Sequence, residues 1–359
     1  MDAVSSTLRH RKVDQLIDKM AATLPFHVAI CLYAIAAIAL NIAYGEFPLS
    51  TFLSYIETLG PMYLVTLPLF SAVAAMALRI SEGQSRRRTV FEALSPPSVE
   101  HFISGLSLMA SFVLMMGAFT SFKTLMPTIW NGFPYDQVQA DLDRLLHFGF
   151  DPGPALVSLK IPQVLRDAMV WNYSMGWSFV GLVPIYFIAT SRFGAHVRLR
   201  YFFSIFSVWL VAGNIVAFLF LSAGPAFYDR IVGDVSRFAP VLAFAAESGT
   251  AFGTPTSFQT FLWNNFQSGT SSVGTGISAF PSLHVAIAMM NALFLRELNK
   301  TAGWFGFIYV AIICISSVCL GWHYAIDGYA SIAIVAILYL AIKRLFRRFE
   351  TVASARIDQ

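Results

Sequence analysis

The chain has 359 residues, of which 57% are hydrophobic and 12% are charged, and its formal net charge is +4. Soluble domains carry about 25% charged residues, so this composition excludes a soluble globular protein and predicts that lipid covers much of the surface. No basic tract is interleaved with aromatic residues, so we expect no nucleic-acid partner.

Eight apolar segments are long enough, or nearly so, to cross a bilayer core of about 30 Å. We therefore expect an all-α polytopic membrane protein with about eight transmembrane helices. Basic residues precede the first segment, as in a signal peptide, but the segment is longer than a usual signal core and lacks a convincing cleavage site, so we interpret it as a retained helix. The segments are 26–44, 62–79, 102–121, 170–190, 202–222, 281–297, 303–321 and 325–342.

The regions between these segments alternate in charge. The first loop carries Glu46 and Glu57 and no Lys or Arg, whereas both termini and the even-numbered loops are basic. Basic segments stay in the cytoplasm, so we expect cytoplasmic termini and an outer location for the long loops 122–169 and 223–280. The basic residues are Arg9, Arg11, Lys12, Lys19, Arg79, Arg86, Arg87, Arg88, Arg192, Arg198, Arg200, Arg296, Lys300, Lys343, Arg344, Arg347 and Arg348.

The first long outer loop contains an amphipathic stretch at 134–149. Its leucines share one face, and its charged residues lie elsewhere, which is typical of a helix at the membrane interface. The leucines are Leu142, Leu145 and Leu146, and the charged residues are Asp136, Asp141, Asp143 and Arg144.

One candidate for chemistry is the run Gly-Ile-Ser-Ala-Phe-Pro-Ser-Leu-His at 276–284. Pro281 favours a helix start, where free backbone N–H groups and the Ser282 hydroxyl form a ready anion site beside His284. Arg296 at the inner end of this helix lies 12 residues later, or about 18 Å, so we expect His284 to be recessed below the outer surface.

A second candidate is Gly-Trp-His-Tyr-Ala-Ile-Asp at 321–327, in which His323 and Asp327 have the i, i+4 spacing of one helix face. The carboxylate can hold the imidazole in one tautomer. His284 and His323 are 39 residues apart, about two membrane crossings, so the chain returns to the same face and the two histidines can meet.

Two histidines, one backed by a carboxylate, beside an anion-binding helix start suit phosphoryl transfer. One attacks phosphorus and the other protonates the leaving oxygen. No metal or other cofactor is needed if N–H groups and cations neutralise the phosphate. Two alternatives remain: a structural His–Asp pair, as in a scaffold, and an ion or proton relay in a transporter.

These residues resemble two signatures of the type 2 phosphatidic acid phosphatase superfamily. Phe-Pro-Ser-Leu-His at 280–284 is similar to the second signature, and the His-to-Asp spacing of 323–327 is similar to the third. The resemblance covers about 102–342 and implies a six-helix core. It implies that His323 is the nucleophile forming a phosphohistidine, that Asp327 orients it, that His284 is general acid and then base, and that Ser282 contacts phosphate.

The sequence also departs from the family. Ser316 is followed by Ser317 where the third signature begins Ser-Arg, and the first signature is not recognisable. At its place stands Ser-Ala-Gly-Pro-Ala-Phe-Tyr-Asp-Arg, 222–230, so Arg230 and Tyr228 are candidate phosphate-binding residues. This segment, and the pairs Tyr135-Asp136 and Asp143-Arg144, resemble the aureobasidin-sensitive inositol phosphorylceramide synthase branch.

Together these observations predict a membrane lipid phosphotransferase with its site at the outer face. Residues 1–100 would hold the N-terminus and two accessory helices, 101–345 the catalytic core, and 346–359 a cytoplasmic tail. The donor would be a phospholipid or lipid phosphate and the acceptor a lipid alcohol. With water as acceptor, the same triad would make a phosphatase of lipid phosphates or polyprenyl pyrophosphates. We expect a bacterial inner membrane, with the site on the periplasmic side.

Overall fold

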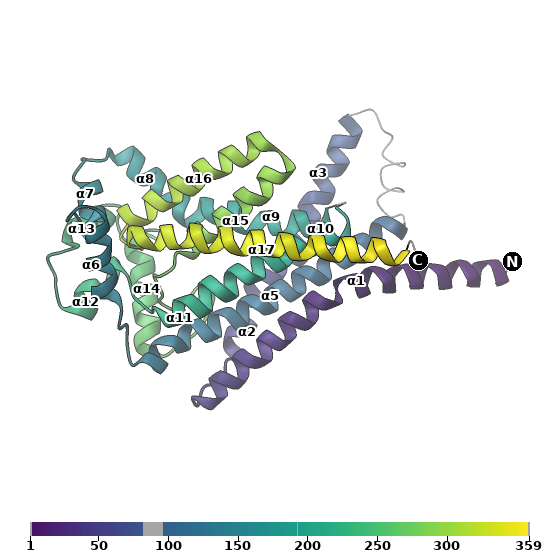
Figure 1. The fold of residues 1–359 in the computed structure, drawn as a ribbon, viewed down its shortest axis with the longest axis horizontal. Helices are drawn as coiled ribbons and strands as arrows, with labels where there is room; N and C mark the ends of the chain where they lie inside the picture. The colour runs from purple at the N-terminus through teal and green to yellow at the C-terminus, as the bar shows by residue number, and fades with distance from the viewer. Residues whose placement is uncertain (1, 82–95, 192, 358–359) are drawn as a thin grey trace. The chain divides into compact units, whose positions relative to one another are not determined.

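The computed structural model describes residues 2–81, 96–191 and 193–357, and every regular element in these ranges is a helix (Figure 1). The predicted basic run Arg86–Arg88 and Arg192 lie outside the described residues. The chain divides into two compact units. One comprises residues 1–118 and 184–202, and the other comprises 119–183 and 203–359.

Seven helical stretches in the described ranges are long and apolar enough to cross a membrane. This confirms the all-α polytopic membrane protein, and the seven stretches correspond to seven of the eight predicted segments. The segment predicted at 281–297 forms α15 (Leu283–Leu298), whose 16 residues extend only about 24 Å. It is short because Ser282 caps its start and Asn299 both ends it and caps the next helix. The seven stretches are Ala21–Ala43, Leu49–Arg79, Val99–Trp130, Gln163–Thr190, Ala195–Leu219, Lys300–Cys319 and Ala325–Arg347.

The first unit contains the helices that precede Pro96 and parts of three further helices. A Cβ placed at Gly117 would come within 2.7 Å of the Phe52 ring, so these helices pack closely there. His27 Nδ1 also lies 2.7 Å from Ser111 Oγ. The elements are α1 (Asp2–Ala43), α2 (Leu49–Pro61), η1 (Met62–Thr66), α3 (Leu67–Ser81) and portions of α5 (Pro96–Trp130), α9 (Trp177–Thr190) and α10 (Ala195–Ser207).

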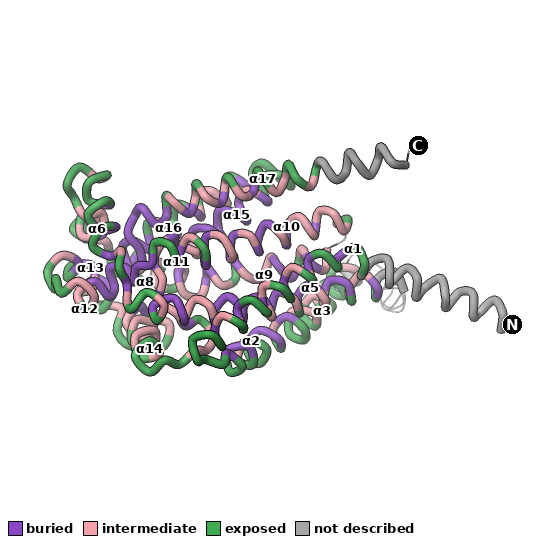
Figure 2. Tube along the Cα trace, turned by 60° about the horizontal axis from the view of Figure 1, so that its bottom comes forward, coloured by how far each residue is buried: buried purple, intermediate pink, exposed green. Residues whose placement is uncertain are grey.

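The second unit holds every residue of the expected triad. Its helices α15, α16 and α17 pack closely, because glycines face their neighbours: a Cβ at Gly306 would meet Ala292 at 2.8 Å. Most residues of α15 are buried (Figure 2). The remaining elements are α6 (Asp136–Leu146), α7 (Pro152–Val157), α8 (Gln163–Trp171), η2 (Asn172–Gly176), η3 (Val208–Val216), α11 (Ala217–Leu219), η4 (Pro225–Phe227), α12 (Tyr228–Val232), α13 (Ala239–Ala246), α14 (Pro255–Ser268), α16 (Lys300–Cys319) and α17 (Ala325–Ile357).

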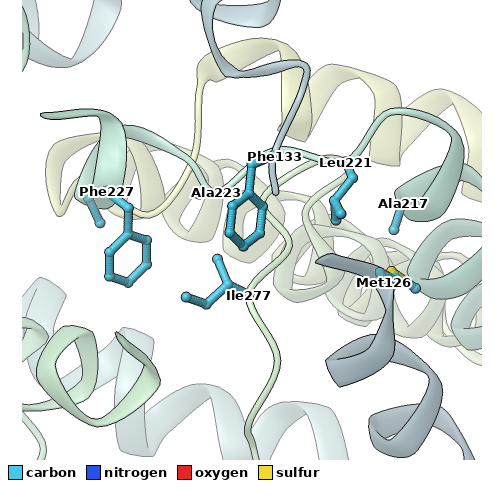
Figure 3. Close-up of a cluster of buried hydrophobic side chains, with 8 residues drawn as sticks. Met126, Phe133, Ala217, Leu221, Ala223, Phe227 and Ile277 are labelled. Atoms are coloured by element: carbon cyan, nitrogen blue, oxygen red, sulfur yellow. The ribbon is translucent and has the colours of Figure 1, made fainter. Parts of the chain in front are cut away.

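The short helices α6, α7, α12 and α13 gather at the end of the second unit where α17 begins (Figure 1). A buried apolar cluster anchors the loops there. Figure 3 shows Phe133 and Ile277 between Phe227 on one side and Leu221 on the other. This cluster fastens the chain around 221–227 to the loop that precedes α15. The segment 221–227 and the loop before α15, which both lie next to the candidate site, are therefore held together by apolar packing.

Candidate active site

His323 stands immediately before α17 and pairs with a carboxylate on the first turn of that helix. Its Nδ1 lies 3.2 Å from Asp327 Oδ2, and the Tyr324 backbone N–H donates to the same oxygen at 3.0 Å. His323 is 7% exposed and Asp327 is fully buried. Because Nδ1 faces the carboxylate, it carries the proton in the assigned tautomer. Nε2 is then the ring nitrogen left to react.

His284 lies on the first turn of α15 against aromatic side chains. Its ring stacks on Tyr173, with centroids 4.4 Å apart, and Trp177 lies at 4.2 Å. Tyr173 belongs to the π-helical turn η2, a distortion that often occurs at functional sites. The Tyr173 ring also stacks on Trp322, beside His323. His284 lies close enough to His323 for the two to interact electrostatically.

Ser282 links α15 to α17. Its backbone N–H donates to Asp327 O at 3.3 Å, its carbonyl accepts from Ser331 Oγ at 2.9 Å, and its hydroxyl caps α15 by accepting from Val285 N. Within the described part of the chain, the Leu283 and His284 backbone N–H groups have no hydrogen-bond acceptor. These two amides at a helix N-terminus are available to an anion.

The segment 222–226 runs between the two motifs. Ala279 N donates to Ser222 O, and Ala226 N donates to Gly321 O, each at 2.8 Å. Gly224 has a φ of +90°, and a Cβ there would lie 2.7 Å from Trp322 O. This position therefore requires glycine both for its backbone conformation and for the close approach of the 321–327 segment.

The two phosphate-binding candidates from this segment make their contacts elsewhere. Tyr228 is buried, and its hydroxyl accepts from Arg237 at 3.2 Å. Arg230 is exposed, and its guanidinium lies over the Trp263 ring at 4.7 Å. Neither forms a hydrogen bond with the triad in the described residues. The structure thus brings together His284, His323, Asp327 and Ser282, while Tyr228 and Arg230 engage other partners.

Lys123 on α5 is a cation that the sequence interpretation missed. Its side chain packs on the loop before α15, because a Cβ at Gly276 would lie 3.0 Å from Lys123 Cγ. It interacts electrostatically with His284. No carboxylate in the described ranges pairs with it. The sequence signal was a lone Lys just beyond the predicted 102–121 span. The candidate span in the structure extends to Trp130 and includes Lys123, and a charged residue within a span is a functional candidate by default.

A family model described as the PAP2 superfamily matches residues 139–341, more than half of the chain. The chain belongs to the PAP2 superfamily. The matched range includes His284, His323 and Asp327. No curated protein and no solved structure matched the chain.

This PAP2 protein is therefore an integral membrane enzyme of the phosphatase and phosphotransferase type, and its substrates are phosphate esters. The expected superfamily is confirmed. The match does not single out the inositol phosphorylceramide synthase branch.

Proposed function

We propose that this PAP2 enzyme transfers a phosphoryl group from a lipid phosphate ester to the hydroxyl of a second lipid, through a phosphohistidine on His323. The observation that carries the proposal is the buried pairing of His323 Nδ1 with Asp327, beside a second histidine. This pairing orients the ring and leaves Nε2 as the nucleophile.

In the first half-reaction, the Nε2 lone pair of His323 attacks phosphorus. A P–N bond forms as the bond from phosphorus to the leaving oxygen breaks, and His284 donates to that oxygen the proton that it takes up when the phosphate anion binds beside it. Asp327 accepts the hydrogen bond from Nδ1–H and stabilises the positive charge that develops on the His323 ring. The products are the released alcohol and the phosphoenzyme.

In the second half-reaction, neutral His284 takes the proton from the acceptor O–H. The acceptor oxygen attacks phosphorus, the P–N bond breaks, and its electron pair returns to His323 Nε2. A lipid alcohol as acceptor gives the transferred product, and water gives hydrolysis.

We infer that the Leu283 and His284 backbone N–H groups and Lys123 bind the phosphate and neutralise its charge. The two amides have no other acceptor among the described residues, and Lys123 acts electrostatically on His284 without a carboxylate partner in the same ranges. Preorganised donors and cations of this kind stabilise the transferring phosphoryl group. Lys123 and Arg230 each lie over an aromatic ring, at 5.9 Å from Phe119 and 4.7 Å from Trp263. Lys123 is the better candidate because it also packs on the loop that leads to His284.

The acceptor assignment rests on the aromatic surroundings of His284. Tyr173, Trp177 and Trp322 form apolar walls beside the two histidines. Apolar walls restrict bulk water and suit a lipid hydroxyl, which supports transfer over hydrolysis. The charge pattern of the loops supports an outer-face location.

The test uses purified protein in mixed micelles containing phospholipids labelled in the head-group phosphate, with and without a lipid alcohol. We expect label to move to the alcohol in the wild type and in the control variant His196→Gln, and not in His323→Gln. An acid-labile, alkali-stable phosphoprotein should form only when His323 is present. Release of label at the same rate without the alcohol would correct the acceptor to water. Equal turnover by wild type and His323→Gln would refute the phosphohistidine.

A further inference from the structure

Helix α6 turns its polar face inward and its apolar face outward. A helix on the surface of a soluble domain has the opposite arrangement, so the buried polar face requires hydrogen-bond partners. Figure 2 shows the exposed residues of α6. The buried face holds Asp136, Gln139, Ala140 and Asp143. The exposed face includes Val138, Leu142, Leu145 and Leu146.

The carboxylate of Asp143 caps the helix that follows His323. Its Oδ2 accepts from Ala325 N and its Oδ1 from Ile326 N, each at 3.0 Å. These are the first two backbone N–H groups of α17, and a carboxylate is favourable at a helix N-terminus. Asp143 therefore holds the backbone directly between His323 and Asp327.

The carboxylate of Asp136, two turns earlier, holds the segment on the other side. Its Oδ2 accepts from Ala223 N at 2.7 Å and its Oδ1 from Gly224 N at 2.8 Å. Oδ1 also accepts from the Tyr324 hydroxyl at 2.8 Å. Asp136 thus joins the 222–226 segment to the residue that follows His323.

Two of these five buried hydrogen bonds, those of Asp143, also distinguish the helix start of α17 from that of α15. The amides that begin α17 are occupied by Asp143, whereas Leu283 N and His284 N at the start of α15 have no acceptor in the described chain. Of these two helix N-termini, only that of α15 therefore offers free backbone N–H groups to an incoming phosphate.

We propose that α6 is a positioning clamp for the phosphoryl-transfer site, in which Asp136 and Asp143 are positioning residues that set the place of His323 relative to His284. The proposal rests on the function proposed above. Without the carboxylates, four backbone N–H groups would be buried unpaired or would compete with α15 for phosphate, and the His323 segment would move. Misplacement of a nucleophile by about 1 Å can cost about 100-fold in rate.

The test compares Asp136→Asn and Asp143→Asn with the matched control Asp141→Asn. Asp141 lies on the same helix, but its side chain is 59% exposed and pairs with Arg237. Rapid-quench measurements give two quantities: the burst amplitude, which counts active sites, and the rate constant of phosphoenzyme formation per active site. We expect the rate constant to fall about 10- to 100-fold in the two clamp variants, with the amplitude retained, and to stay within about 2-fold in the control.

Two burst outcomes would overturn the clamp. One is a lower amplitude with an unchanged rate constant per site, which marks a loss of folded protein only. The other is wild-type behaviour in both clamp variants.

A second measurement needs no turnover and separates the clamp from the proposed reaction. Carbethoxylation of His323 by diethyl pyrocarbonate is followed by peptide mass spectrometry. Because His323 is 7% exposed, we expect slow modification in the wild type and the control, and modification at least about 5-fold faster in Asp143→Asn. Equal modification rates would refute the clamp, whether or not the wild type forms a phosphoenzyme. Failure of the wild type to form a phosphoenzyme would refute the proposed function alone.

Discussion

Replacing Asp327 with Asn removes the charge and keeps the shape of the side chain, and it leaves a buried NH₂ group unpaired, which costs about 1–3 kcal/mol of stability. Both hydrogen bonds that it receives, from His323 Nδ1 and Tyr324 N, go to Oδ2. Oδ1 is buried and has no partner among the described residues. In Asp327→Asn, the amide oxygen can take the place of Oδ2 and the NH₂ group the place of Oδ1. The variant should therefore keep both hydrogen bonds and the histidine tautomer.

The size of the effect follows from these contacts. A hydrogen bond to a charged group contributes about 1.5–3 kcal/mol, and a neutral one about 0.5–1.5 kcal/mol. The difference of about 1–1.5 kcal/mol corresponds to a kcat about 5- to 15-fold below the wild type. Asp327→Ala removes both hydrogen bonds and frees the ring, so we expect a loss of about 1,000-fold or more, as for other orienting carboxylates.

The assay is steady-state transfer by both variants with one lipid ester, with His323→Gln as the inactive reference. If Asp327→Asn is as inactive as Asp327→Ala, the amide has reversed the tautomer or lost the pairing, and an acceptor at the place of Oδ2 is not enough to orient His323. If Asp327→Ala keeps wild-type activity, Asp327 does not orient the nucleophile.

Three further predictions concern the surroundings of the triad. Lys123→Met should lower kcat/KM about 10- to 100-fold, through loss of a charge-assisted contact to phosphate, while the exposed Lys160→Met leaves it unchanged; equal values would remove Lys123 from the site. Burial raises the pKa of Asp136 to about 6, so the folded state binds this proton more tightly than the unfolded state. As pH rises from about 4 to about 6, the wild type should therefore lose about 2 kcal/mol of stability relative to Asp136→Asn, and parallel plots of Tm against pH would contradict this. Gly224→Ala should unfold at a clearly lower Tm than Gly233→Ala, because both have positive φ but only Gly224 lacks space for a Cβ; equal shifts in Tm would contradict the close approach.

Much of the fold could be predicted from the sequence, because it depends on composition and local periodicity. Apolar runs of membrane length indicate spans wherever they occur, and seven of the eight predicted segments correspond to candidate spans. The eighth segment forms α15, which is shorter than the other seven. Capping at Ser282 and Asn299 makes α15 shorter than a bilayer core. The proximity of His323 and Asp327 was also predictable from their spacing of four residues, although His323 stands just before α17 and only Asp327 lies on its first turn.

Tertiary structure alone decided which polar residues from distant segments serve the site. Lys123 and His284 are far apart in the sequence, and only the folding of the loop before α15 onto α5 brings them together. The periodicity of α6 predicted an interfacial helix, but it could not reveal that Asp136 and Asp143 face inward. A buried polar group needs partners. For these carboxylates the partners are backbone N–H groups, which carry no sequence signal and become available only where distant turns and helix ends meet.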